Sequence, residues 1–266
     1  MQLTILGSGS SAGTPAIGCY CNTCTSNNPR NKRTRCSSMI TLDSGKTILI
    51  DTGPDLRMQA LRESITNIDA VLYTHTHADH LHGIDDLRGF CQANRKQIPL
   101  YSYKEALDHI KSNFGYTLRE PCDFWDLPVL SINEVNAPFE LFGATITPIP
   151  IMHGRIQIYG YRIGNIAYMT DVSNIPDSSF SLLENLDLLL IDCLRVKEHP
   201  THINIEQSLA YISQIKAKQS ILIHMTHELE YDALTNMLPK NVFVGFDGMN
   251  VKLNGVNEIA ANSFNS

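Results

Sequence analysis

A short segment in the first third of the chain carries four potential metal ligands directly after an apolar run. Residues 70–73 (Ala-Val-Leu-Tyr) predict a buried strand, and residues 74–80 read Thr-His-Thr-His-Ala-Asp-His. Imidazole and carboxylate groups bind zinc and related metals, and loops at strand ends are common places for functional sites. The neighbouring side chains of Asp79 and His80 diverge, so all four ligands cannot reach one ion without severe strain. The segment therefore predicts two metal ions, bound by His75, His77, Asp79 and His80.

More potential ligands follow apolar runs later in the chain. They are His153 after residues 145–152, Asp171 after residues 166–170, and His224 after residues 220–223. A single histidine in such a place is usually a structural residue with a hydrogen-bond partner. Three polar residues at three predicted strand ends instead favour ligands that complete two metal sites. Asp192 ends a similar run, and we interpret it as a hydrogen-bond acceptor behind the ligands.

Short runs rich in β-branched residues recur along the chain, each bounded by Gly, Pro, Asp, Asn or Ser, as is typical of strands. The predicted strands are 3–6, 39–42, 47–50, 70–73, 145–151, 166–169, 186–191 and 220–223, and the predicted helices are 54–63, 104–113 and 204–215. Ser44-Gly45 predicts a hairpin, and Asn204 with Gln207 has the spacing of a helix-capping pair. The pattern predicts an α/β fold with two mixed sheets and helices outside them.

Length and charge limit the domain organisation and the partners. The 266 residues predict a single domain over 1–256, with a small metal-binding loop near 18–36 and a C-terminal tail over 257–266. A net charge of −6 argues against a polynucleotide partner, and we interpret the basic stretch 30–35 as a solvated loop. The N-terminus lacks a secretory signal and no apolar run approaches the ~20 residues that span a bilayer, so we expect a cytoplasmic protein without a membrane partner. The sequence leaves open whether the protein forms a homodimer.

Three of the seven cysteines are clustered near the N-terminus. Cys19, Cys21 and Cys24 are spaced closely enough to bind one metal, and an odd cysteine count disfavours a disulfide framework. Cys36 is a chemically suitable fourth ligand, because thiolate binds zinc as well as imidazole does. The remaining cysteines, Cys91, Cys122 and Cys193, are predicted to be small buried hydrophobic residues.

The order of these candidate ligands resembles that of the metallo-β-lactamase superfamily. The resemblance implies a four-layer αββα sandwich over nearly the whole chain. It also implies that His75, His77 and His153 bind one metal, that Asp79, His80 and His224 bind the other, and that Asp171 bridges them. Residues 48–53 (Ile-Leu-Ile-Asp-Thr-Gly) are similar to the superfamily's early strand, which makes Asp51 a residue that orients the histidine loop.

The cysteine cluster resembles more narrowly the cyclic-phosphate phosphodiesterases of the carbon-phosphorus lyase pathway, the PhnP-like branch. That branch has a separate structural zinc, which by position implies the ligands Cys19, Cys21, Cys24 and His227. Thr201-His202-Ile203-Asn204 matches a Thr-His-x-Asn motif whose histidine assists catalysis in the branch. The implied cofactors are two active-site metal ions, zinc or manganese, and one structural zinc.

The resemblance implies hydrolysis of a small or cyclic phosphodiester. Two metals about 3.5–4 Å apart can hold one bridging hydroxide as the nucleophile. His202 would protonate the leaving group or stabilise the phosphoryl oxygens, while Asp79 and Asp171 hold the metals. A thioesterase or lactonase and a tRNA 3'-end endonuclease are the alternative enzymes, although the endonuclease's basic substrate arm is not visible in the sequence. A non-catalytic zinc-binding scaffold is the alternative of another class.

Overall fold

The computed structural model describes residues 1–119 and 129–253, which form two seven-stranded sheets. The first sheet has the order β14-β1-β2-β3-β4-β5-β6. Its strands are β1 (Gln2–Gly7), β2 (Ser37–Thr41), β3 (Thr47–Ile50), β4 (Ala70–Leu72), β5 (Ile98–Ser102), β6 (Leu130–Glu134) and β14 (Asn250–Lys252). The strands from β3 to β6 run parallel, whereas β14, β1, β2 and β3 pair antiparallel, so the sheet is mixed.

The second sheet has the order β13-β12-β11-β10-β9-β8-β7 and is also mixed. Its strands are β7 (Phe139–Leu141), β8 (Ala144–His153), β9 (Ile156–Ile163), β10 (Ile166–Met169), β11 (Leu188–Asp192), β12 (Gln219–Ile223) and β13 (Val242–Val244). Here β10 to β13 run parallel, and β7 to β10 pair antiparallel.

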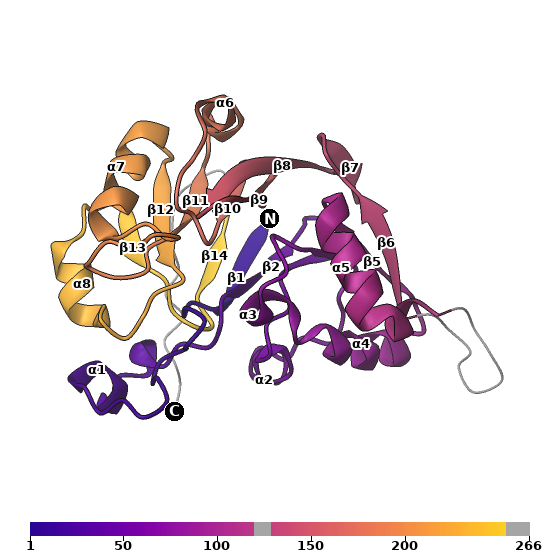
Figure 1. The fold of residues 1–266 in the computed structure, drawn as a ribbon, viewed down its shortest axis with the longest axis horizontal. Helices are drawn as coiled ribbons and strands as arrows, with labels where there is room; N and C mark the ends of the chain where they lie inside the picture. The colour runs from indigo at the N-terminus through magenta and orange to yellow at the C-terminus, as the bar shows by residue number, and fades with distance from the viewer. Residues whose placement is uncertain (120–128, 254–266) are drawn as a thin grey trace.

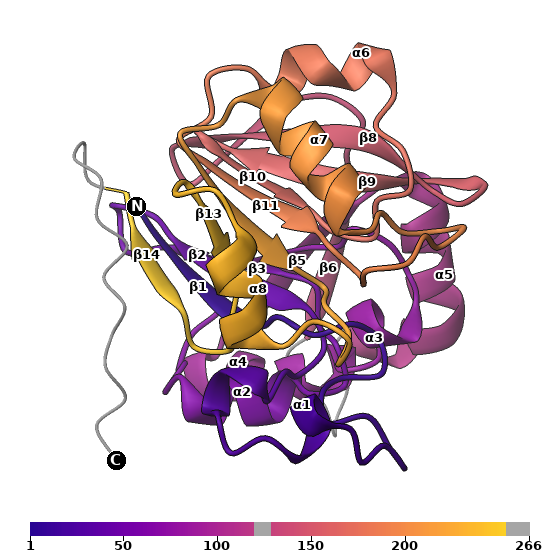
Figure 2. The same cartoon turned by 90° about the vertical axis from the view of Figure 1, so that its left-hand side faces the viewer.

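Helices cover the outer faces of both sheets, as Figures 1 and 2 show. The first sheet is covered by α2 (Leu56–Arg62), α4 (Leu87–Asn94) and α5 (Lys104–Phe114), and the second by α6 (Asp177–Phe180), α7 (Ile205–Ile215) and α8 (Tyr231–Met237). The short helices α1 (Asn22–Thr25) and α3 (Ala78–Leu81) and the 3-10 turns Pro29–Asn31, Ile84–Asp86, Gly115–Leu118 and Ser181–Leu183 lie in the connections. The layering is the predicted helix-sheet-sheet-helix sandwich.

The sandwich explains why the strands read as continuous apolar runs rather than as alternating patterns. In β3, Ile48 and Ile50 point into the core between the sheets, where they meet Ile149 and Ile151 of the second sheet. Leu49 points the other way, into the core beneath the helices. Successive side chains of a strand face opposite sides, so a strand with apolar layers on both faces needs apolar residues throughout.

Local signals in the sequence fix two of the connections. Gly45 has a φ of +79° in the turn between β2 and β3, whose antiparallel register pairs Thr41 with Thr47, so the predicted hairpin is confirmed. At the start of α7, the Asn204 side chain accepts a hydrogen bond from the backbone of Gln207 and the Gln207 side chain accepts one from the backbone of Asn204. This reciprocal cap confirms the predicted helix start.

The basic stretch 30–35 is not a solvated loop, and that prediction is wrong. Arg33 is only 2% exposed, the guanidinium of Arg35 pairs with Asp55 at 2.9 Å, and that of Arg30 lies 4.9 Å from the ring centre of Tyr231. Charge alone gave no sign of this burial, because the partners lie far away in the sequence.

Other predictions have mixed outcomes. Cys91 and Cys193 are buried as predicted, whereas Cys122 and the tail 257–266 lie outside the described residues. Within the parts of the chain that the structure describes, no helix has the length and apolar character needed to cross a bilayer.

Candidate metal centre

Strand ends from both sheets bring the predicted ligands together. The segment 74–80 follows β4 of the first sheet and runs into α3, while His153 ends β8 of the second sheet. Asp171 follows β10 and His224 follows β12. Carboxyl ends of parallel strands meet at one edge of a sheet, and here the edges of two sheets face each other, so ligands far apart in sequence become neighbours.

Two groups of side chains present possible metal-binding atoms within 4.8 Å of one another, and a third group, Asp171, His202 and His224, draws one member from each of them. The first group is His75, His77, His153 and Asp171, and the second is Asp79, His80 and His224. These are the residues that the sequence singled out, divided as the resemblance implied. Imidazole and carboxylate groups in such sets suit zinc or manganese.

Asp171 faces both groups through different oxygens. Its Oδ1 lies 3.1 Å from Nε2 of His80 and 3.4 Å from Nε2 of His224. Its Oδ2 lies 3.8 Å from Nε2 of His75 and 3.9 Å from Nε2 of His153. One carboxylate is therefore placed to give one oxygen to each of two ions.

The ligand histidines are oriented by hydrogen bonds at the opposite ring nitrogen. Nδ1 of His80 lies 2.8 Å from the carboxylate of Asp51, and Nδ1 of His75 lies 3.0 Å from the hydroxyl of Thr74, which donates to the same carboxylate. Nδ1 of His153 lies 2.8 Å from the carbonyl of Thr201. Each acceptor takes the proton of Nδ1, so Nε2 is the nitrogen that faces the centre and that a metal would bind in place of a proton.

The electrostatics of the buried site also fit a cation. Burial, with the neighbouring His80, holds the pKa of His75 well below its usual value. Burial likewise opposes the charged form of His80, but Asp171 and Asp51 outweigh it and raise the pKa of His80 well above its usual value. Nε2 of His75 and Nε2 of His80 are buried and lack hydrogen-bond partners among the described residues. Such atoms are costly unless something positive binds them, so the donor set fits metal ions.

Three residues of the centre have a left-handed backbone that is rare outside glycine. The φ angles are +62° for Asp51, +56° for Asp171 and +59° for His224. Each residue follows a strand, and the positive φ turns the chain sharply at that point. Such conformations cost of the order of 1–3 kcal/mol each and cluster at functional sites.

His202 lies beside the two groups and is held by Asp192. Nδ1 of His202 lies 2.9 Å from Oδ2 of Asp192, and Nε2 of His202 lies 3.8 Å from Oδ2 of Asp171. Asp192 also accepts a hydrogen bond from the backbone of Val172, so its position is fixed. The acceptor role that the sequence suggested for Asp192 therefore has a definite partner, and His202 points its free nitrogen at the centre.

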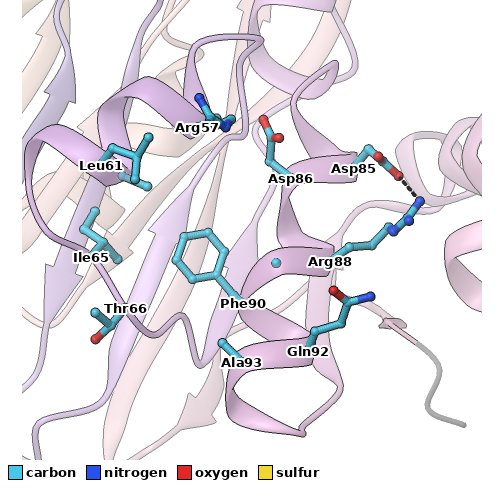
Figure 3. A pocket seen from close by; sticks show the side chains of 12 residues that line it. Arg57, Leu61, Ile65, Thr66, Asp85, Asp86, Arg88, Phe90, Gln92 and Ala93 are labelled. Carbon is cyan, nitrogen blue, oxygen red and sulfur yellow. Dashed lines mark hydrogen bonds and ion pairs between the residues drawn. The ribbon is translucent and has the colours of Figure 1, made fainter.

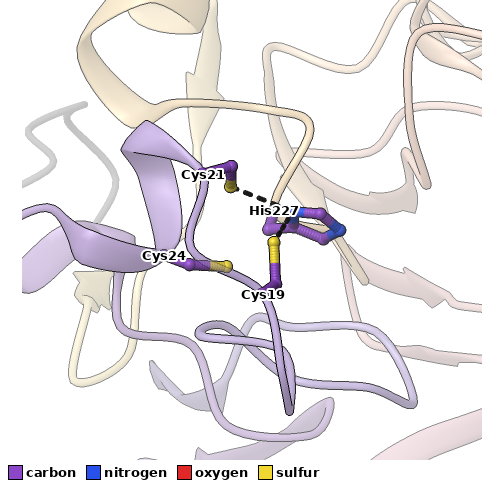
Figure 4. Close-up of side chains that lie close together, drawn as sticks. All are labelled: Cys19, Cys21, Cys24 and His227. Atoms are coloured by element: carbon purple, nitrogen blue, oxygen red, sulfur yellow. Dashed lines mark hydrogen bonds between the residues drawn. The ribbon is translucent and has the colours of Figure 1, made fainter.

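The cysteine cluster forms a second, separate site, shown in Figure 4. Cys19, Cys21, Cys24 and His227 present possible ligand atoms within 4.8 Å of one another. Nδ1 of His227 lies 3.2 Å from the sulfur of Cys21, and this contact lowers the pKa of Cys21 to about 6. Cys36 is fully buried between the sheets, 3.2 Å from the hydroxyl of Tyr168, so the geometry favours His227 as the fourth ligand.

The other histidines lie outside these groups. His199 is half-buried, with its ring centre 5.3 Å from that of His202, and His82 is exposed and contacts Phe114. His109 lies on the exposed side of α5. The sequence carries no signal that Thr74 or the carbonyl of Thr201 orients a ligand, although each residue directly precedes a histidine of the centre.

A hollow of about 510 Å³ lies between α2 and α4, away from these clusters. Figure 3 shows Arg57, Leu61, Asp86 and Phe90 among its side chains. None of the residues lining this hollow belongs to a candidate metal group among the described residues. Its mixed charges and apolar patches do not provide the reactive groups found at the strand ends.

Comparisons with known proteins agree with the fold and the ligand order. Residues 46–225 match the beta-lactamase superfamily domain. A crystal structure of a diphosphatase from the PhnP family is 41% identical with a TM-score of 0.87, covering 94% of this chain and 96% of that chain. The chain therefore belongs to the metallo-β-lactamase superfamily and, within it, to the PhnP family. Its fold and side-chain groups are those of a hydrolase that binds metal.

Two further relatives widen the comparison. A Porphyromonas gingivalis protein named octanoyltransferase is 41% identical over 253 residues, which cover 94% of this chain and 51% of the relative. The chain thus spans about half the length of that protein. Zinc-bound PqqB from Methylobacterium extorquens has a TM-score of 0.78 at 20% identity, covering 95% of this chain and 100% of that chain, and at this identity the likeness shows the fold alone.

Proposed function

We propose that the protein is a dinuclear metal-dependent phosphodiesterase that hydrolyses small or cyclic phosphodiesters. The observation that carries the proposal is the position of Asp171, whose two oxygens face two separate groups of ligands. A carboxylate in this position joins two metal ions, and two metals a few ångströms apart are typical of enzymes that cleave phosphate esters.

In this proposal the chain holds three ions. The reaction centre binds two, zinc or manganese, through His75, His77 and His153 on one side, Asp79, His80 and His224 on the other, and Asp171 between them. The third is a structural zinc on Cys19, Cys21, Cys24 and His227. Three thiolates and one imidazole make a closed tetrahedral set, which leaves no open position for a substrate.

The metal pair, when bound, would supply an activated water for attack on phosphorus and would withdraw charge from the phosphoryl oxygens. The chain's own contribution is the proton at His202. Asp192 accepts from Nδ1 of His202, which fixes the ring so that a proton carried on Nε2 is directed towards the centre. In this position His202 donates that proton to the departing oxygen of the substrate.

The PhnP-family structure that this chain resembles is a diphosphatase. Cleavage of a diphosphate and cleavage of a phosphodiester both begin with attack of water on phosphorus and end with protonation of a departing oxygen. The proposed centre accommodates either substrate, and a direct comparison of the two decides which one the protein prefers.

Hydrolysis of an acyl thioester is the second candidate function. The observation that favours it is the name octanoyltransferase of the Porphyromonas gingivalis relative. This chain matches only 51% of that relative, so the named activity can belong to the other half. An activated water attacks a thioester carbonyl as readily as phosphorus, and the chemistry of the centre alone does not separate the two.

The test is a substrate screen with purified protein loaded with zinc or manganese. We expect turnover of bis(p-nitrophenyl) phosphate and of a cyclic phosphodiester, about two metals per chain beyond the cysteine-bound zinc, and loss of turnover after chelation. A diphosphate ester, an octanoyl thioester and a lactone are measured in parallel. Turnover of the thioester alone would replace the proposal with the second candidate. One metal or fewer per chain after repletion, or no turnover by the fully loaded protein, would overturn it in favour of a scaffold.

A further inference from the structure

The backbone between the two metal-binding clusters is very short. His224 belongs to the reaction centre and His227 to the cysteine cluster, so only Met225 and Thr226 separate them. A segment of this length would ordinarily transmit any disturbance from one cluster to the other. What holds the segment in place therefore decides whether the two sites depend on each other.

Backbone hydrogen bonds secure the first part of this segment. The N–H of Met225 donates to the carbonyl of Ser8 at 3.0 Å, and its carbonyl accepts from the N–H of Ser10 at 3.0 Å. The N–H of Thr226 donates to the carbonyl of Leu194 at 2.9 Å. The N–H of Leu229 donates to the carbonyl of Thr226 at 3.3 Å and closes the turn around His227, and the carbonyls of Thr226 and Leu229 each accept a hydrogen bond from one side chain.

Arg33 supplies both donors. Its Nη1 donates to the carbonyl of Thr226 at 3.0 Å, and its Nη2 donates to the carbonyl of Leu229 at 2.7 Å. The side chain is 2% exposed, and burial lowers the pKa of Arg33 to about 10, so the guanidinium stays charged at neutral pH. Asp247 and Glu230 oppose that shift as the nearby negative charges. A planar fork with two fixed N–H groups spans two carbonyls, which the single ammonium group of lysine does not do.

The backbone of Arg33 is fixed as well. Its N–H and carbonyl pair with Thr14 at 2.8 Å in both directions, so the guanidinium is held from a stable base. Through these hydrogen bonds Arg33 joins Thr14, which precedes the cysteine cluster in the sequence, to the turn that carries His227. None of these four hydrogen bonds of Arg33 involves a cysteine side chain.

We propose that Arg33 is a positioning residue that isolates His224 from the cysteine cluster, an inference that rests on the proposed metal-dependent function. With Arg33 present, loss of the structural zinc leaves His224 in place and the reaction centre keeps its metals. Without Arg33, the turn around His227 depends on zinc, and loss of zinc displaces His224 through the two intervening residues.

The test is a double-mutant cycle of Cys21→Ser with Arg33→Met, read out by metal binding rather than by turnover alone. Metal affinity of the reaction centre is measured by chelator competition, and cobalt substitution separates the clusters, because thiolate-to-cobalt charge-transfer bands report only the cysteines. We expect Cys21→Ser alone to change the affinity of the reaction centre by less than about threefold, and the same change in the Arg33→Met background to weaken it by about tenfold or more.

The matched control is Arg30→Met in the same stretch, whose guanidinium contacts the hydroxyl of Tyr231 at 3.2 Å. Its effect should add to that of Cys21→Ser without coupling. If Arg33→Met does not fold, Arg33→Lys carries the test, since it keeps the charge and loses the fork, and it should show a smaller coupling of the same sign. Additive effects, or a lower Tm without any change in metal affinity, would overturn the inference. Because these readouts need no substrate, they stand apart from failure of the proposed activity.

Discussion

The reaction centre and the cysteine cluster, with seven and four candidate ligands, hold these ligands in place by different means. Ligands of the reaction centre come from strand ends in two sheets, and buried partners such as Asp51 and the carbonyl of Thr201 orient their rings. Three ligands of the cysteine cluster come from the stretch 19–24, which carries only the short helix α1. We therefore expect the fold alone to orient the ligands of the first site, and a bound metal to contribute more to the order of the second site.

The largest effect that this comparison predicts follows from removing the bridge. Asp171→Asn should lower kcat by on the order of a thousandfold or more and reduce the metal content of the reaction centre. The substitution removes the negative charge of the carboxylate and replaces one of its two oxygens with an amide nitrogen, which does not bind metal. Elemental analysis and steady-state kinetics measure both effects. Asp187→Asn is the control, since this carboxylate pairs with Lys218 at the surface. An Asp171→Asn protein with full activity and full metal content would contradict the bridging role.

Removing the proton donor should have the next largest effect. His202→Ala should lower kcat by on the order of a hundredfold while both metals of the reaction centre stay bound, because in the proposed function the other seven candidate ligands complete the two metal sites and His202, 3.8 Å from Asp171, supplies the proton. Kinetics on an active substrate together with elemental analysis separate the two roles. His109→Ala, on the exposed side of α5, is the control. Loss of a metal from the His202→Ala protein would make His202 a ligand instead.

A smaller effect on kcat is expected from changing Asp192, the acceptor that holds His202. Asp192→Asn should lower kcat by about tenfold to a hundredfold with little change in KM, because the neutral amide oxygen is a weaker acceptor for the Nδ1 proton than a carboxylate, and an amide nitrogen turned to the ring cannot accept it. The dependence of kcat on pH should change as well, which a purely structural defect would not cause. An Asp192→Asn protein with a lower Tm and an unaltered pH profile would contradict the positioning role.

The smallest effect on turnover is expected at the cysteine cluster. Cys21→Ser should lower the Tm and remove one zinc per chain, yet lower kcat by less than about threefold, because a closed zinc site stabilises folding and contributes no open position. Differential scanning fluorimetry and elemental analysis measure the change. Tyr20→Ser is the neighbouring control, since Tyr20 is 87% exposed. A Cys21→Ser protein with the wild-type Tm and zinc content would remove the distinction between the clusters.

The sequence predicts the ligands better than it predicts what orients them. The ligands follow apolar runs, and the spacing of His75, His77, Asp79 and His80 is visible within six residues. Asp51 and Asp192 are predicted as orienting groups because each ends an apolar run, but Thr201 and Thr74 carry no such mark. Thr201 acts through its backbone carbonyl and Thr74 through a hydroxyl that any surface threonine also has. Their role depends on which strand ends meet, and only the folded chain determines that.

The same limit explains some of the missed elements of the fold, which also include β5, β6, β7, α4 and α8. Strands β13 and β14 are three residues each, too short for a periodic pattern, and β9 contains Gly160 and Arg162, which interrupt its apolar run. Pairing with neighbours decides these strands. The burial of Arg33 was missed for a related reason, since the carbonyls that it contacts lie nearly two hundred residues away at Thr226 and Leu229.

The left-handed backbone at Asp51, Asp171 and His224 costs folding free energy at residues that the proposed reaction needs, so stability and activity make opposite demands on these positions. Glycine adopts such angles without strain, so His224→Gly would relax the chain at the very position where it removes a ligand. A selection that rewards only expression level or heat resistance would therefore favour inactive variants at these positions. Directed evolution of this scaffold needs an activity screen at every round, because a substitution that raises stability at a strand end can do so by removing a metal ligand.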